Sequence, residues 1–280
     1  MNEVLTRRLA AVLAADPRCS YQELAEQVGL SRITVKDRLQ RLLESGSVRL
    51  TGCLHPVALG LPVAAELVTD AAAARVADAL AGHPAVRIST VGDGFTEAAL
   101  HARDDEQLAE LAARVRAAGA SVRLFRVLRT LRGGLPACPR PARMDELDHR
   151  LAQLVIADPR ARLTRLAPEL GLSDRAVGTR LKRLLDTRTL VLQVLVRPEP
   201  PVTAFRVEIC SRAGSAHIAH QLKDVEGITY LATGRGSCEV LVRLRAHTSF
   251  QQRHQLRTLK RLLGIGQMTI RQYPTAGSAR

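Results

Sequence analysis

An internal repeat constrains the fold of this chain more than any other feature of its sequence. A shift of 142 residues superimposes residues 5–56 on residues 147–198 without a gap, with 21 identities in the 52 positions. The same shift maps Gly92 and Gly94 onto Gly234 and Gly236. Because self-similarity of this length marks a duplicated structural unit, we expect the 280-residue chain to consist of two copies of one unit.

Breaks in composition divide each copy into two parts. Residues 132–143 hold two glycines and three prolines, a composition that resists helix formation and favours extended chain. Smaller breaks fall at His55-Pro56 and at residues 197–201. The sequence therefore predicts four domains and one linker. The domains cover residues 1–56, 57–132, 143–198 and 199–280, and the linker covers residues 133–142.

The first part of each copy has the pattern of three short helices. Apolar residues at helical spacing follow Leu5 until Asp16-Pro17 ends the first helix. Ser20 with Glu23 three residues later forms a capping-box pattern that opens a second helix. Gly29-Leu30-Ser31 supplies a tight turn, and Ser31 can cap a third helix that runs to about Ser45. This order is typical of a helix-turn-helix domain.

The third helix offers a polar face that suits the major groove of DNA. Residues near the N-terminus of such a helix reach base edges, whereas arginines and lysines farther along hold phosphates. We expect base contacts from Ser31, Arg32, Ile33 and Thr34, and backbone contacts from Lys36, Arg38 and Arg41. The corresponding candidates in the second copy are Arg175, Arg180 and Arg183. Pro168 and Gly178 weaken the second set of helices, so the first copy is the expected reader.

The net charge of the chain also indicates a polyanionic partner. The formal charge is +14, with most of the excess in residues 143–280. Each phosphate that a basic side chain neutralises releases condensed counterions, so double-stranded DNA is the expected partner.

The second part of each copy has the pattern of a small α/β domain. Strand and helix patterns alternate in the order βαββαβ in both copies, which suits a ferredoxin-like sheet with helices on one face. The other face of such a sheet needs a partner. In the first copy the expected elements are residues 63–68, 71–81, 86–91, 97–102, 104–118 and 122–131. The predicted fold class is α+β, with two winged-type helix-turn-helix domains, each followed by a ferredoxin-like βαββαβ domain.

These residues resemble the leucine-responsive regulator/AsnC (Lrp/AsnC) family of transcriptional regulators. The resemblance lies in residues 24–48 (LAEQVGLSRITVKDRLQRLLESGSV) and in residues 54–60 (LHPVALG). It also lies in the glycine pairs Gly92/Gly94 and Gly234/Gly236, each in the expected hairpin between the second and third strands of its α/β domain. It implies a sequence-specific DNA-binding regulator that responds to an amino acid and forms homo-oligomers. Two fused copies would pair their sheets within one chain as an intrachain pseudo-dimer. The implied effector site comprises Gly92, Asp93, Gly94, Gly234, Arg235 and Gly236.

Other functions remain open at this point. The predicted fold also resembles that of siroheme decarboxylases, which are enzymes. A third alternative with this fold is an assembly partner that has lost DNA binding. The chain has no Trp, its histidines are scattered, and its five cysteines form no closely spaced pair. We therefore expect a protein that is not an enzyme, without catalytic residues, metal or cofactor. No apolar run is long enough to span a membrane, and the first residues lack a secretory pattern, so the expected location is the cytoplasm.

Overall fold

The computed structural model describes residues 3–91, 94–138, 140–196, 203–262 and 264–273. The chain divides into two compact units, and each unit takes one part from each repeat. The helical unit consists of residues 1–59 and 135–198, and the sheet unit consists of residues 60–134 and 199–280.

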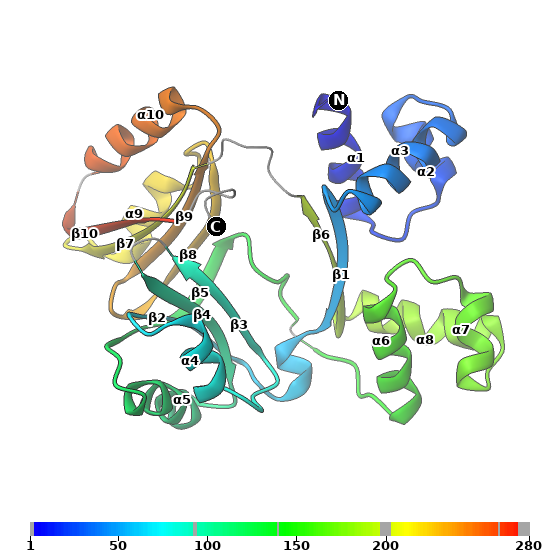
Figure 1. Ribbon diagram of the computed structural model, residues 1–280, viewed down its shortest axis with the longest axis horizontal. Helices are drawn as coiled ribbons and strands as arrows, with labels where there is room; N and C mark the ends of the chain where they lie inside the picture. The colour runs from blue at the N-terminus through cyan, green and yellow to red at the C-terminus, as the bar shows by residue number, and fades with distance from the viewer. Residues whose placement is uncertain (1–2, 92–93, 139, 197–202, 263, 274–280) are drawn as a thin grey trace. The chain divides into compact units, whose positions relative to one another are not determined.

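The helical unit contains a three-helix domain from each repeat, with the predicted helix-turn-helix order (Figure 1). In the first domain, Ser20 and Glu23 form the predicted capping box at the start of the second helix. Gly29 then ends that helix in the left-handed conformation that glycine favours, with φ of 73°. The helices and the short 3-10 turn of this unit are α1 (Glu3–Ala15), α2 (Tyr21–Val28), α3 (Arg32–Glu44), η1 (Pro56–Leu59), α6 (Glu146–Ala157), α7 (Leu163–Leu170) and α8 (Asp174–Asp186).

A strand follows the third helix of each domain and finds its partner in the other repeat. β1 (Val48–Leu54) and β6 (Leu190–Val196) form an antiparallel two-stranded sheet. Thr51 lies opposite Gln193 at its midpoint, and these two positions are equivalent in the repeats. The sheet therefore lies on a local pseudo-twofold axis. Neither strand was predicted from the sequence.

Two arginines join the same two domains by reciprocal hydrogen bonds. Arg18 donates to the carbonyl oxygens of Pro159 and Ala161, both at 2.6 Å. Its repeat equivalent Arg160 donates to the carbonyl oxygens of Pro17 and Cys19, at 2.9 and 2.8 Å. Each acceptor pair is the repeat equivalent of the other. The tetrapeptide Ala-Asp-Pro-Arg occurs at residues 15–18 and again at residues 157–160, and its arginines thus form a symmetrical clamp inside the helical unit.

The sheet unit contains one eight-stranded sheet in the order β10-β7-β9-β8-β5-β2-β4-β3. Each half has the strand order of a ferredoxin-like βαββαβ domain, and the antiparallel β5–β8 pair joins the halves. The first half contains β2 (Val63–Thr69), α4 (Ala73–Ala79), β3 (Val86–Val91), β4 (Phe95–Ala102), α5 (Asp105–Ala117) and β5 (Val122–Arg132). The second half contains β7 (Thr203–Ser211), α9 (Ser215–Leu222), β8 (Ile228–Gly236), β9 (Val240–Ala246), α10 (Ser249–Lys260) and β10 (Ile265–Gln272).

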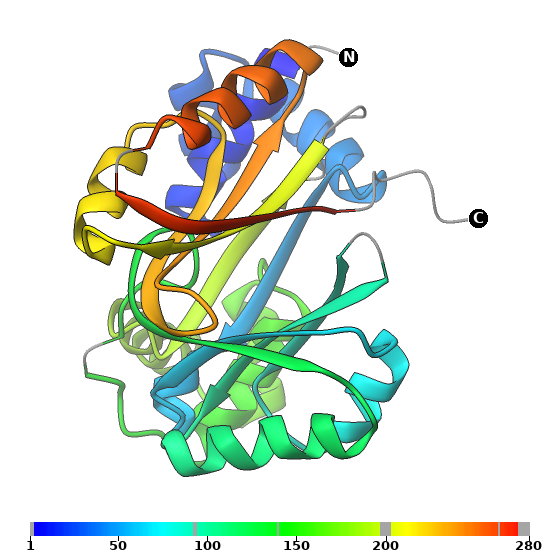
Figure 2. The same cartoon turned by 90° about the vertical axis from the view of Figure 1, so that its left-hand side faces the viewer.

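The inner faces of the two halves cover each other. Helices α4 and α5 pack on one half and α9 and α10 on the other, with the strands between the two helix pairs (Figure 2). Phe125, Tyr230 and Leu241 belong to one buried cluster that draws on both halves. The predicted need for a partner on the uncovered sheet face is therefore met within the chain. No helix in the described ranges is both long and apolar enough to cross a membrane.

Candidate nucleic-acid interface

Local hydrogen bonds fix the N-terminus of α3. The Ser31 side chain accepts a hydrogen bond from the Thr34 backbone N–H at 3.1 Å, and the two hydroxyl oxygens lie 2.8 Å apart. This N-cap sets the direction of the first helical turn, while Val35, Leu39 and Leu42 are buried in the domain core. Ser31 and Thr34 thus position the helix, and their neighbours present its outer surface.

The first turn of α3 exposes an apolar side chain between polar neighbours. Ile33 is 74% exposed, and Arg32 and Lys36 are exposed beside it. Within the described part of the chain, neither Arg32 nor Lys36 forms an ion pair. Burial offers no reason for an isoleucine at this position, whereas a thymine methyl group in the major groove would give it an apolar partner. This turn therefore has the composition of a base-reading surface.

Two further arginines lie farther along α3. Arg41 is exposed, and its Nε donates to the Asp37 carbonyl oxygen at 3.2 Å. Arg38 is half-buried, and its Nε has no hydrogen-bond partner among the described residues. With Arg32 and Lys36, these arginines give the helix four cations that lack a carboxylate partner among the described side chains.

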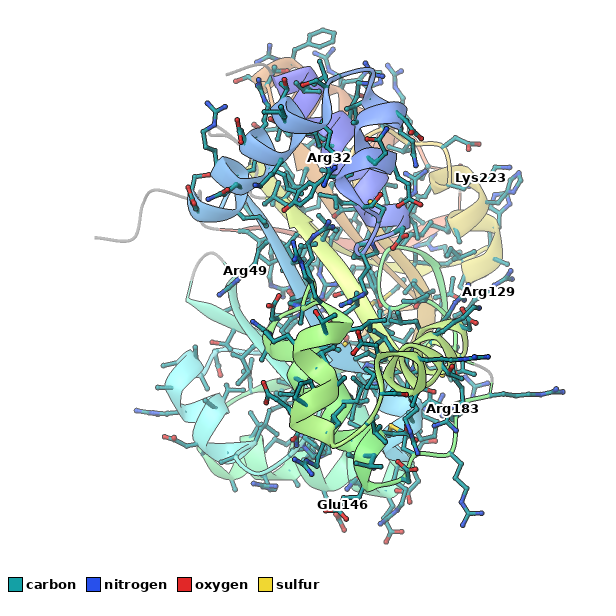
Figure 3. The ribbon with its side chains drawn as sticks, turned by 90° about the vertical axis from the view of Figure 1, so that its right-hand side faces the viewer. Arg32, Arg49, Arg129, Glu146, Arg183 and Lys223 are labelled. Carbon is teal, nitrogen blue, oxygen red and sulfur yellow. The ribbon has the colours of Figure 1, made fainter. Side chains whose placement is uncertain are left out.

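The second repeat places its equivalent arginines in a different environment. Arg180 Nη1 lies 2.7 Å from Asp145 Oδ2 and 2.8 Å from Asp148 Oδ1. Arg183 Nη2 pairs with the other oxygen of Asp148. The hydrogen bonds to these two acids raise the pKa of Arg180. Arg175 is exposed at the start of α8. Figure 3 labels Arg32 on α3, and Arg183 on α8 together with Glu146 in the first turn of α6.

The two residues expected to weaken the second repeat lie inside its helices. Pro168 is within α7, where it removes one backbone donor. Gly178 is within α8, and an added Cβ there would meet Leu163 Cδ1 at 3.2 Å. Gly178 stands at the position of Lys36, so α8 lacks one of the exposed cations of α3.

A second group of charges is buried between the halves of the sheet unit. We call this group the ionic layer. Its members connect the first repeat to the second by ion pairs and hydrogen bonds. Arg243 Nη2 lies 2.7 Å from Glu66 Oε2 and also contacts Glu97. Arg206 contacts Glu97 and lies 2.9 Å from Glu208. The remaining members of the layer are Arg123, Arg271 and Tyr273.

The two acids of the first repeat have opposite pKa shifts. Burial raises the pKa of Glu66 to about 7, although Arg243 opposes the shift. Burial also acts to raise the pKa of Glu97, but the guanidinium groups of Arg206 and Arg243 prevail and lower it to about 2. One carboxyl group of the layer is therefore partly protonated near neutral pH, while its neighbour is ionised.

The glycines of the implied effector site lie in different environments. Gly92 and Asp93 fall outside the described residues, and Gly94 follows them with φ of 80°. Gly234, Arg235 and Gly236 lie in β8, where they pair with β5. An added Cβ at Gly234 would collide with the Arg126 carbonyl oxygen and one at Gly236 with the Leu124 carbonyl oxygen, so both glycines permit the close β5–β8 approach.

Family models match the helical domains of both repeats. A model described as a winged helix-turn-helix DNA-binding domain matches residues 5–49. A model of the AsnC-type helix-turn-helix domain matches residues 144–185. The comparison with curated proteins gave no significant match. The described residues contain no group of three or more His, Cys, Asp or Glu side chains that could hold a metal ion.

Solved structures match the chain over different lengths. The siroheme decarboxylase NirDL has a TM-score of 0.63 at 14% identity, covering 96% of this chain and 90% of that one. NirDL in complex with an iron-uroporphyrin III analogue gives a TM-score of 0.61 with the same identity and coverage. The leucine response regulatory protein of Mycobacterium tuberculosis has a TM-score of 0.38 at 24% identity, covering 49% of this chain and 100% of that one.

The whole-chain matches correct one expectation. The sequence led us to expect that the protein is not an enzyme, yet the fold that spans both repeats is also the fold of a decarboxylase. That expectation is therefore wrong.

The architecture of the chain follows from the domains and the fold together. Both helix-turn-helix domains are matched by family models, each is followed by a ferredoxin-like domain, and the two copies are fused in one polypeptide. The protein is a tandem duplication of the Lrp/AsnC-like architecture.

Proposed function

We propose that this protein is a sequence-specific DNA-binding transcriptional regulator that reads the major groove with α3. The observation that carries the proposal is the exposed Ile33, which stands between Arg32 and Lys36 at the start of a capped helix. An apolar side chain with cations on either side fits a groove lined by base edges and phosphates. The positive net charge of +14 supports the same partner.

A binding assay with matched variants tests this proposal. The purified chain should prefer fragments of its own upstream region over random DNA of equal length. Lys36→Ala should weaken binding to all sequences and reduce the slope of log K against log salt by about 0.9, the value for one phosphate contact. Ile33→Ala should instead reduce the preference for the best site. Lys223→Ala, which removes one exposed lysine from the sheet unit, is the control for Lys36→Ala. Equal binding by all four proteins would contradict the proposal.

We extend the proposal to modulation by an amino acid or a related small molecule. The support is the resemblance of the hairpin glycines to those of amino-acid-responsive regulators. A ligand that binds only the folded protein raises its unfolding temperature, so a thermal-shift screen of the common amino acids should yield at least one stabiliser. That stabiliser should also change the DNA affinity, and a screen without any stabiliser would remove this extension.

A second candidate function is turnover of a siroheme-like tetrapyrrole. The observation that favours it is the likeness to NirDL, which extends over both repeats. Such substrates carry several carboxylate groups, for which arginine is the matching side chain. Arg206 lies in the ionic layer with an Nη2 atom that has no hydrogen-bond partner among the described residues. Incubation with siroheme under anaerobic conditions, followed by mass analysis of the porphyrin, should give a product lighter by the mass of carbon dioxide. Unchanged siroheme would exclude this candidate.

A further inference from the structure

The acids at the start of α6 hold the two arginines on which phosphate binding by α8 would depend. Asp148 is buried, with a side chain only 1% exposed, and each of its oxygens accepts from a different arginine of α8. Asp145 adds a second acceptor for Arg180. The charges of these two carboxylates and two guanidinium groups cancel. This part of the second helix-turn-helix domain therefore has no net formal charge that would attract DNA.

The first repeat lacks the central acid of this cluster. Thr6 occupies the position of Asp148, while Arg38 and Arg41 occupy the positions of Arg180 and Arg183. Neither Arg38 nor Arg41 forms an ion pair with any described side chain. Glu3 stands at the position of Asp145, so the first repeat differs from the second by the loss of the central acid. Among the described residues, the retained arginines have acid partners only in the second repeat.

One other substitution on α8 acts in the same direction. Asp174 stands at the position of Arg32, which places an acid in the first turn. Lys182 pairs with Asp186 at 2.5 Å. Of the cations on α8, only Arg175 lacks an ion pair with a described residue. Apart from Arg175, which stands at the position of Ile33, the cations of α8 are therefore paired with acids.

We propose that Asp148 and Asp145 form an intramolecular ionic lock that withdraws the second recognition helix from DNA, so that each chain reads a single half-site through α3. This inference rests on the proposed DNA-binding function. It assigns α8 a packing role inside the chain, since the carboxylates that hold its arginines would also repel a phosphate placed there.

Chemical modification of arginine tests the lock without DNA. The full chain is treated with an arginine-selective dicarbonyl reagent, and the modification rate of each peptide is followed by mass spectrometry. Arg175 should react fast, and Arg180 and Arg183 should react several-fold more slowly. Asp148→Asn should accelerate both, because it removes the charge yet keeps an acceptor for the helix cap. Glu146→Gln is the matched control, since this exposed acid in the same first turn has no ion pair with a described residue. Equal rates in Asp148→Asn and Glu146→Gln would overturn the lock.

DNA binding tests the consequence for half-site reading. On a fragment with two half-sites, one chain of the unaltered protein should protect one half-site. Asp148→Asn should protect the second and steepen the salt slope by about 1.8, the value for two added phosphate contacts. If Asp148→Asn fails to fold, Asp145→Asn tests Arg180 alone, because the exposed Asp145 pairs with that arginine only. This variant should steepen the salt slope by about 0.9, the value for one phosphate contact. A footprint that does not grow beyond that of Glu146→Gln would overturn the inference. If the unaltered protein prefers no site at all, the proposed function fails, and the modification rates still decide whether the lock exists.

Discussion

Replacing Glu66 by glutamine should make the stability of the sheet unit less dependent on pH. The Glu66 side chain is 6% exposed, and burial raises its pKa from 4.5 in the unfolded chain to about 7. A raised pKa in the fold means that the protonated group contributes stability below pH 4.5, and that this contribution is lost as the pH rises through 7. The difference between these pKa values corresponds to a loss of about 3 kcal/mol in the free energy of unfolding. Glutamine mimics the protonated carboxyl group and does not ionise, so Glu66→Gln should not show this loss.

Urea unfolding between pH 5 and pH 8.5 measures the effect. Far-UV circular dichroism follows the transition, and hydrogen exchange of the β2 amides assigns it to the sheet unit. Glu97 acts in a separate window, because its lowered pKa gives a contribution that is lost only as the pH falls from 4.5 toward 2. Glu106→Gln, at an exposed position on α5, is the control. If the unaltered protein and Glu66→Gln lose equal stability over this range, the assigned role of Glu66 in the ionic layer is wrong.

Three other substitutions have expected effects on stability, each measured by urea unfolding. Arg18→Ala should lower the free energy of unfolding by about 2 kcal/mol, the value for charge-assisted hydrogen bonds. If the clamp acts as one unit, Arg18→Ala combined with Arg160→Ala should lower it by less than twice that amount. Additive losses would show two independent contacts. Arg188 is the only described non-glycine residue with a positive φ, at 56°, so Arg188→Gly should be about 1 kcal/mol more stable than Arg188→Ala, and equal stability would show that the conformation carries no strain. Gly234→Ala should destabilise the sheet unit by about 3 kcal/mol or open the β5–β8 pair, because its Cβ would collide with the Arg126 carbonyl oxygen. Gly82→Ala lies at an open loop position outside that pair and should leave the β5 and β8 amides protected from hydrogen exchange.

Local sequence patterns predicted most of the elements. The capping box at Ser20 and the turn at Gly29 depend on a few neighbouring residues, so the sequence contains all the information needed to place α2 and α3. Strand β3 has the predicted bounds of Val86–Val91, and α4 is shorter than predicted, since it runs from Ala73 to Ala79. Such end effects depend on caps that periodicity does not reveal.

Contacts between the repeats could not be predicted in the same way. The partner of β1 lies in β6, more than a hundred residues away, and no local pattern names it. In the sequence, Asp148 looks like any acid in the first turn of a helix. Only the folded structure shows that Arg180 and Arg183 contact it. Comparison of the two repeats gives one clue to this contact: Asp148 replaces Thr6, while both arginines are retained. An acid that is present in only one repeat, beside two arginines that both repeats retain, indicates that these arginines have a different partner in that repeat.

The pairing of β1 with β6 also bears on how the protein responds to dilution. Its two helical domains belong to one polypeptide, so their local concentration is set by the connecting chain and is typically in the millimolar range. An assembly of separate subunits falls apart as its concentration drops, and its subunits must stay alike because one gene encodes both. A fused pair keeps its geometry at any cellular abundance, and each half can change without altering the other. One half can therefore retain its surface for a partner while the other becomes part of the scaffold.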